Sequence, residues 1–166
     1  QGHQRPKIEE YGKSLFVVMK MVELVDGVLT VGEVDVFVGP NYVLSVRRNS
    51  EHGFVSVRQR CESEPELLKQ GSGFVLYALM DAVVDRYFPI IDTLELELEA
   101  IEAKIFSQER GAARSNIEAL YQLKSKVTVL KHAVAPLFEA AGRLHGGRTP
   151  GVCANTQEYF RDVSDH

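Results

Sequence analysis

Residues 74–105 read FVLYALMDAVVDRYFPIIDTLELELEAIEAKI, and their spacing carries most of the information about the fold. Apolar side chains recur there every three or four residues, which is the period of one face of an α-helix. These positions are Leu76, Met80, Val83, Tyr87, Ile91, Leu94, Leu98, Ile101 and Ile105. The stretch therefore predicts one long helix, with a bend expected at the internal Pro89.

A second helical pattern follows a turn at Gly111, and Pro136 marks a second expected bend. Its apolar positions are Ile117, Leu120, Val127, Leu130, Val134, Leu137, Ala141 and Leu144. Two long helices joined by a short turn must lie antiparallel. The first helix is acidic at Glu95, Glu97, Glu99 and Glu102, and the second is basic at Lys124, Lys126, Lys131 and His132. We expect a hairpin with solvated faces of complementary charge.

The residues before position 70 have the pattern of β-strands instead. The segments 15–25 and 28–38 are rich in branched and aromatic side chains, and Asp26-Gly27 between them is a hairpin signal. A third strand is expected at 42–47 after a turn at 39–41, and short helices at 54–61 and 65–70. Such short connections favour antiparallel pairing, because parallel strands need long crossovers.

Together these patterns predict an α+β fold, a mostly antiparallel or mixed sheet flanked by helices. We expect one domain in three segments: a β-rich part at 1–70, the helical hairpin at 71–148, and a loop with the start of another helix at 149–166. That last helix is expected to begin near Thr156 or Gln157. The length of 166 residues is enough for one domain with its own core.

The composition argues against several functional classes. Nineteen basic and twenty-three acidic residues give a formal net charge of -4, which disfavours nucleic acid as a partner. Cys61 and Cys153 lack the spacing of a zinc site or a disulfide framework, so a reducing compartment fits. The sequence contains no apolar run of about eighteen residues, so we do not expect these residues to span a membrane.

No enzyme motif stands out. The segment 69–73 (KQGSG) is glycine-rich but lacks the spacing of a phosphate-binding loop, so we interpret it as a loop in which Ser72 caps the long helix. The histidines are scattered along the chain, at His3, His52, His132, His145 and His166. We therefore expect a protein that is not an enzyme.

Two pairs of aspartates point towards metal chemistry. Asp81 and Asp85 are four residues apart beside the apolar stripe, a costly place for charge without a partner. Asp162 and Asp165 are three apart at the start of the last helix. Carboxylates on rigid helices suit a hard cation such as Mg²⁺, which takes one or two of them and keeps several waters. The ordinary alternative is that these are solvated surface acids.

Four segments resemble the CorA-type magnesium channel family. They are 3–9 (HQRPKIE) with 15–18 (LFVV), 74–88 (FVLYALMDAVVDRYF), 135–137 (APL) and 159–166 (YFRDVSDH), and they occur in the family's order. The resemblance implies a homopentamer at the cell inner membrane, with a cytoplasmic α/β/α domain, a long stalk helix and two membrane helices per subunit. It also implies a Gly-Met-Asn pore motif beyond residue 166, so that this chain alone would not conduct ions.

The resemblance further implies regulatory Mg²⁺, with Co²⁺ or Zn²⁺ as alternatives, between neighbouring cytoplasmic domains. The positions that match the family's ligands are Asp81 and Asp162. Asp85 and Asp165 match acidic positions in the same motifs. Another family ligand, and further strands of the sheet, are expected upstream of the segment at 3–9.

Two alternatives remain open on the sequence. A zinc-transporting relative would share this fold and motif order, although Zn²⁺ prefers His and Cys ligands and no such cluster is visible. A helical adaptor that binds partner proteins through its hairpin belongs to a different class. A reading frame that continues into two apolar spans would favour the channel over the adaptor.

Overall fold

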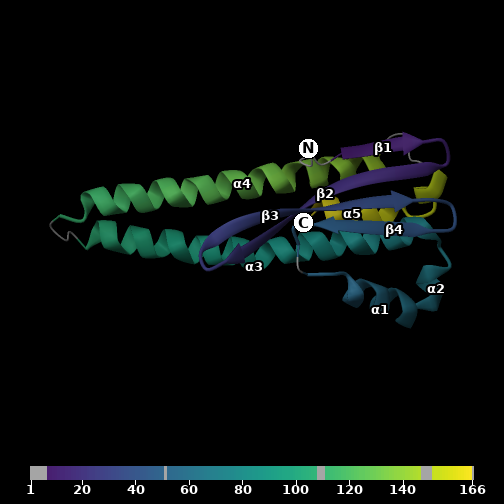
Figure 1. Ribbon diagram of the computed structural model, residues 1–166, viewed down its shortest axis with the longest axis horizontal. Coiled ribbons are helices and arrows are strands. Elements are labelled where there is room, and N and C mark those ends of the chain that lie inside the picture. The colour runs from purple at the N-terminus through teal and green to yellow at the C-terminus, as the bar shows by residue number, and fades with distance from the viewer. Residues whose placement is uncertain (1–6, 51, 108–110, 147–150, 166) are drawn as a thin grey trace.

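A computed structural model describes residues 7–50, 52–107, 111–146 and 151–165 of the chain. A curved β-sheet lies across two long helices, and the hairpin formed by these helices extends beyond one end of the sheet (Figure 1). The first residues of the motif at 3–9, the expected loop at 147–150 and His166 lie outside the described residues. The α+β class and the antiparallel sheet that the sequence predicts are confirmed.

The sheet is a four-stranded antiparallel meander in the order β1-β2-β3-β4. Its strands are β1 (Lys7–Tyr11), β2 (Ser14–Val25), β3 (Val28–Val38) and β4 (Val43–Arg48). The Asp26-Gly27 turn joins β2 to β3 with φ of 50° and 78°, the positive pair that a two-residue hairpin turn of type I′ needs. Three of these strands were expected. The short, charged β1 (KIEEY) was missed because it has little apolar alternation.

Three α-helices follow the expected layout: α3 (Ser72–Phe106), α4 (Ala113–His145) and α5 (Gln157–Asp165). Two short helices, α1 (Val55–Ser63) and α2 (Pro65–Leu68), precede them, and a 3-10 turn, η1 (Gly151–Cys153), leads into α5. The antiparallel hairpin of α3 and α4 is confirmed, and Lys126 reaches Glu97 across it at 3.1 Å. Both helices run through their prolines without ending, so the bends stay predictions.

The hydrophobic core lies between the sheet and the helices. Val34, Val36 and Val38 on β3 are fully buried, whereas Phe37 between them is 41% exposed, as the alternation predicts. The stripe on α3 is buried at Leu76, Met80 and Val83 but exposed at Leu98 and Ile105. This difference arises because the far half of the hairpin extends beyond the sheet and has only its partner helix to pack against.

The helices cover one face of the sheet. The other face carries Phe37, Leu44 and Val46, which are exposed among the described residues. Helices α1 and α2 pack against α3 rather than on that second face. The resemblance implies three layers, α/β/α. The described residues contain two of them, the sheet and one layer of helices.

Helix α5 is fixed against the start of α3 by close packing. A Cβ on Gly73 would lie 2.6 Å from both the Thr156 hydroxyl and the Val152 carbonyl oxygen, so only glycine allows this approach. The ring of Tyr159 stacks 5.1 Å from that of Tyr77. These contacts position the aspartates of α5 beside α3.

The expected capping role of Ser72 is wrong. The residue that caps α3 is Gly71, whose φ is 96°, and Ser72 is the first residue of the helix. Its buried hydroxyl donates a hydrogen bond to the Gly39 carbonyl oxygen at 2.5 Å. This bond ties the start of α3 to the turn between β3 and β4, because a buried hydroxyl must find a partner.

Candidate functional site

Asp81 lies on α3 where helix α1 packs against it. Arg60 of α1 donates to the Asp81 carboxylate, with 3.2 Å between Nη1 and Oδ2. The Asp81 side chain is 20% exposed and that of Arg60 is 43% exposed, so this ion pair is partly open to water. The charge next to the apolar stripe therefore has the partner that its position demands.

The charges of Asp81 and Asp162 both act on the phenol of Tyr77. Burial raises the pKa of Tyr77 most, and the negative charges of Asp81 and Asp162 raise it further, while Arg60 lowers it. The Arg60 guanidinium lies 6.0 Å from the centre of the Tyr77 ring. Both carboxylates thus lie within electrostatic range of one phenol, one from α3 and one from α5.

Asp162 on α5 is exposed, and the other two candidate aspartates are surface residues as well. Asp85, one turn after Asp81, is exposed. Asp165 is exposed near the end of α5 and pairs with Arg161, with 3.6 Å between Oδ2 and Nε. Ion pairs between side chains this exposed contribute little to stability.

The four aspartates do not form a metal cage within one chain. Among the described residues, no three His, Cys, Asp or Glu side chains gather in a way that could hold a metal ion. The pair Asp81 and Asp162 offers oxygen donors only, which suits Mg²⁺ better than Zn²⁺. The donor chemistry therefore fits an ion that takes one or two carboxylates and keeps its waters.

Sequence reasoning missed a buried charge cluster on the sheet. Glu33 and Asp35 of β3 are 4% and 6% exposed. Lys20 contacts Glu33 at 2.8 Å from β2, and Arg48 contacts Asp35 at 3.6 Å from β4. Burial and the neighbouring Glu33 raise the pKa of Asp35. The alternation along β3 places these acids on the sheet face away from the core, where exposed side chains are expected. Only the folded structure shows that they are buried.

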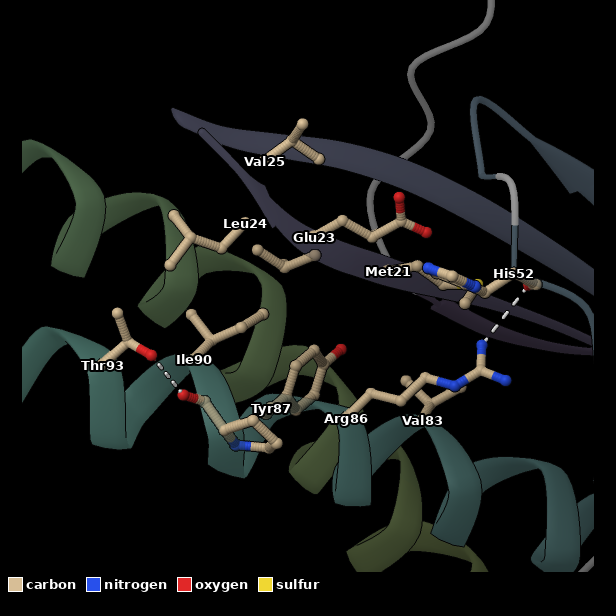
Figure 2. A pocket seen from close by; sticks show the side chains of 12 residues that line it. Met21, Glu23, Leu24, Val25, His52, Val83, Arg86, Tyr87, Ile90 and Thr93 are labelled. Carbon is tan, nitrogen blue, oxygen red and sulfur yellow. Dashed lines mark hydrogen bonds between the residues drawn. The ribbon is translucent and has the colours of Figure 1, made fainter. Parts of the chain in front are cut away.

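A cavity of about 410 Å³ lies between β2 and α3. Figure 2 shows Leu24, Val25 and Ile90 at one end and Arg86 with His52 at the other. Two of its polar side chains already have partners in the protein. Arg86 donates to the Gly53 carbonyl oxygen at 2.6 Å, and the Tyr87 hydroxyl donates to that of Lys20 at 2.5 Å. We interpret the cavity as part of the packing between β2 and α3.

None of the described helices combines the length and the apolar character needed to cross a bilayer. The whole chain, residues 1–166, matches the family described as CorA-like Mg²⁺ transporter protein. The chain belongs to the CorA family. The family resemblance carried by the four motifs is confirmed.

Two curated proteins are similar to the chain along nearly its full length. The cobalt/magnesium transport protein CorA of Thermotoga maritima is 29% identical, over 99% of this chain and 47% of its own length. The YfjQ protein of Bacillus subtilis is 28% identical, over 100% of this chain and 50% of its own. The chain thus spans about half the length of the curated relatives it matches.

A solved structure of the CorA family agrees with the fold. The soluble domain of CorA from Methanocaldococcus jannaschii matches with a TM-score of 0.76 and 18% identity, over 98% of this chain and 64% of that one. At this level of identity the likeness shows the shared fold alone. The agreement confirms the α+β class and its arrangement of sheet and hairpin.

Proposed function

We propose that this chain is the cytoplasmic regulatory part of a CorA-family divalent-cation channel of the cell inner membrane. In this proposal the complete protein is a homopentamer that conducts Mg²⁺, and Co²⁺ as well, through membrane helices. Family membership over the whole chain supports transport. It also favours a channel over a helical adaptor, because the family is described as a transporter.

The regulatory ion in this proposal is Mg²⁺ held between neighbouring subunits. Asp81 of one subunit and Asp162 of the next each provide a carboxylate, and waters complete the coordination. The observation that carries the proposal is the packing of α5 on α3 at Tyr77, where the rings of Tyr159 and Phe160 lie 5.1 and 6.3 Å from the Tyr77 ring. In this proposal Asp85 and Asp165, on the same two helices, are further candidate ligands and add negative charge around the ion.

A shared ion explains why one chain offers no cage. A site completed at an interface needs only one ligand from each subunit, which agrees with the lack of a three-ligand group among the described residues. Such a site has low affinity because few bonds hold the ion. Low affinity suits a sensor, which must empty as the free Mg²⁺ concentration falls.

Charge repulsion provides the driving force for opening. Two like charges about 4 Å apart repel by about 4 kcal/mol at an effective dielectric constant of about 20. Moving a two-state gate from mostly shut to mostly open takes about 5.5 kcal/mol. Several interfaces around a ring can supply that energy together even if each contributes only a fraction.

The test is the Mg²⁺ sensitivity of the complete channel. Asp81→Ala and Asp162→Ala are each expected to raise the Mg²⁺ concentration that half-closes the channel, by about tenfold for the loss of one carboxylate ligand. Current across a bilayer with stepped internal Mg²⁺ measures this. Asp92→Ala, at an exposed aspartate further along α3, is the matched control and should behave like the parent. Unchanged sensitivity in both site variants would contradict the proposal.

A further inference from the structure

We propose that Arg60 is a tethered counter-ion of the regulatory site. Its guanidinium competes with the divalent cation for the Asp81 carboxylate and so raises the Mg²⁺ concentration at which the site fills. This inference rests on the proposed function, since it assigns a role to Arg60 at the same site. It adds helix α1 to the sensing machinery.

The geometry places the positive charge of Arg60 on the carboxylate that the ion would use. Its Nη1 lies 3.2 Å from Oδ2 of Asp81, and the same guanidinium lies 6.0 Å from the Tyr77 ring centre. A cation that binds Asp81 must displace this contact or share the carboxylate with it. In either case the two positive charges repel each other at close range.

Side chains other than Arg60 hold α1 in place, so the position of the helix does not depend on the pair between Arg60 and Asp81. Val57 and Cys61 of α1 are 6% and 5% exposed and pack into the hydrophobic core. Arg60 itself is 43% exposed, so it can swing into water without unseating the helix. Helix α1 therefore stays in place when the Arg60 guanidinium leaves Asp81.

A second arginine on α1 shows that this contact is particular to Arg60. Arg58 pairs with Glu62 on its own helix at 2.9 Å, and both side chains are largely exposed. It makes no contact with α3 among the interactions of the described residues. Arg58 is the same residue type on the same helix as Arg60, but it pairs with Glu62 instead of Asp81. It is therefore a matched control.

The strength of the pair sets the expected effect. Partly exposed ion pairs are weak, so Arg60 should tune the affinity for the ion rather than block the site. Removing its charge with Arg60→Gln is expected to lower the Mg²⁺ concentration for half-saturation by about fivefold. Arg60→Lys, which keeps one positive charge without the planar fork, should lie between the parent and Arg60→Gln.

The experiment measures Mg²⁺ binding to the complete protein in detergent, by the protection that MgCl₂ gives against limited proteolysis. Arg60→Gln should shift the protection midpoint to lower Mg²⁺, and Arg58→Gln should leave it unchanged. In an Asp81→Asn background, Arg60→Gln should cause no further shift, because its target is gone. Unfolding of each variant without Mg²⁺ separates a change in the fold from a change in affinity.

The possible outcomes separate this inference from the proposed function. If Asp81→Asn weakens protection while Arg60→Gln leaves the midpoint in place or raises it, the counter-ion role is overturned and the regulatory site stands. If neither Asp81→Asn nor Asp162→Asn changes protection, the regulatory site itself is wrong and the inference falls with it. An equal shift from Arg58→Gln would show a general charge effect and would also overturn it.

Discussion

Asp35 is an acid held where its charge is costly. It is 6% exposed on β3, and burial together with Glu33 raises its pKa above the ordinary value of 3.8. A carboxyl group with a higher pKa in the folded state binds its proton more tightly there than in the unfolded chain. Its ionisation therefore costs stability: the cost is absent below the unfolded pKa and grows as pH rises through the folded pKa.

Asp35→Asn is neutral at every pH and should escape this cost. Relative to the parent, we expect it to gain stability as pH rises from 4 to 7, by on the order of 1 kcal/mol at neutral pH. Urea unfolding of the 166-residue chain at both pH values measures the difference. Asp92→Asn, at an exposed aspartate, should show no such trend. Lower stability of Asp35→Asn at neutral pH would mean that its ion pair with Arg48 outweighs the burial.

Single residues also show where sequence reasoning reaches its limit. The spacing placed Asp81 beside an apolar stripe and so required a partner, but nothing in the sequence identified Arg60, twenty-one positions earlier, as that partner. The role of Ser72 was predicted wrongly because serine beside glycines is typical of a helix N-cap. Its buried hydrogen bond to the Gly39 carbonyl oxygen depends on the tertiary fold, which the local sequence does not show. The roles of all four aspartates as ligands stay predictions.

At the level of elements, sequence periodicity predicted those helices and strands that the local sequence determines. The two long helices α3 and α4 follow from apolar spacing, and the β2–β3 hairpin follows from Asp26-Gly27. The exposure of Leu98 and Ile105 could not be predicted this way. A stripe of constant period does not show where the neighbouring sheet ends.

The contact between α3 and the loop before α5 gives a sharp test of element packing. Gly73→Ala would place a methyl group 2.6 Å from two oxygen atoms, those of the Thr156 hydroxyl and the Val152 carbonyl. We expect a loss of about 1–3 kcal/mol, the usual cost of overpacking. Gly142→Ala on α4 is the control, because its Cβ would meet nothing within 4 Å.

The control variant Gly142→Ala has its own expected effect on stability. Alanine is a better helix former than glycine, so Gly142→Ala should be neutral or gain up to about 1 kcal/mol. Chemical unfolding of the two variants, followed by far-UV circular dichroism, measures both effects. If Gly73→Ala proves as stable as the parent, α5 is not held as closely to α3 as the packing indicates.

On the scale of the whole molecule, the proposal requires two acids from different copies to act as one site. The chain alone supplies no complete set of ligands among its described residues, so the ion's affinity belongs to the assembly. Residues that serve a single site are coupled, whereas residues at independent sites have additive effects. The assembled protein can therefore be tested through the energetics of a pair of mutations.

The double variant Asp81→Asn with Asp162→Asn is the decisive combination. If both carboxylates hold one ion, removing the second costs little once the first is gone, so the double variant should bind Mg²⁺ about as weakly as the worse single variant. Pairing Asp81→Asn with Asp92→Asn provides the control, and should match Asp81→Asn alone. Protection of the complete protein by MgCl₂ gives the midpoint for each variant. Losses that simply add for Asp81 and Asp162 would mean two separate weak sites, and the bridging ion that joins neighbouring copies would have to be given up.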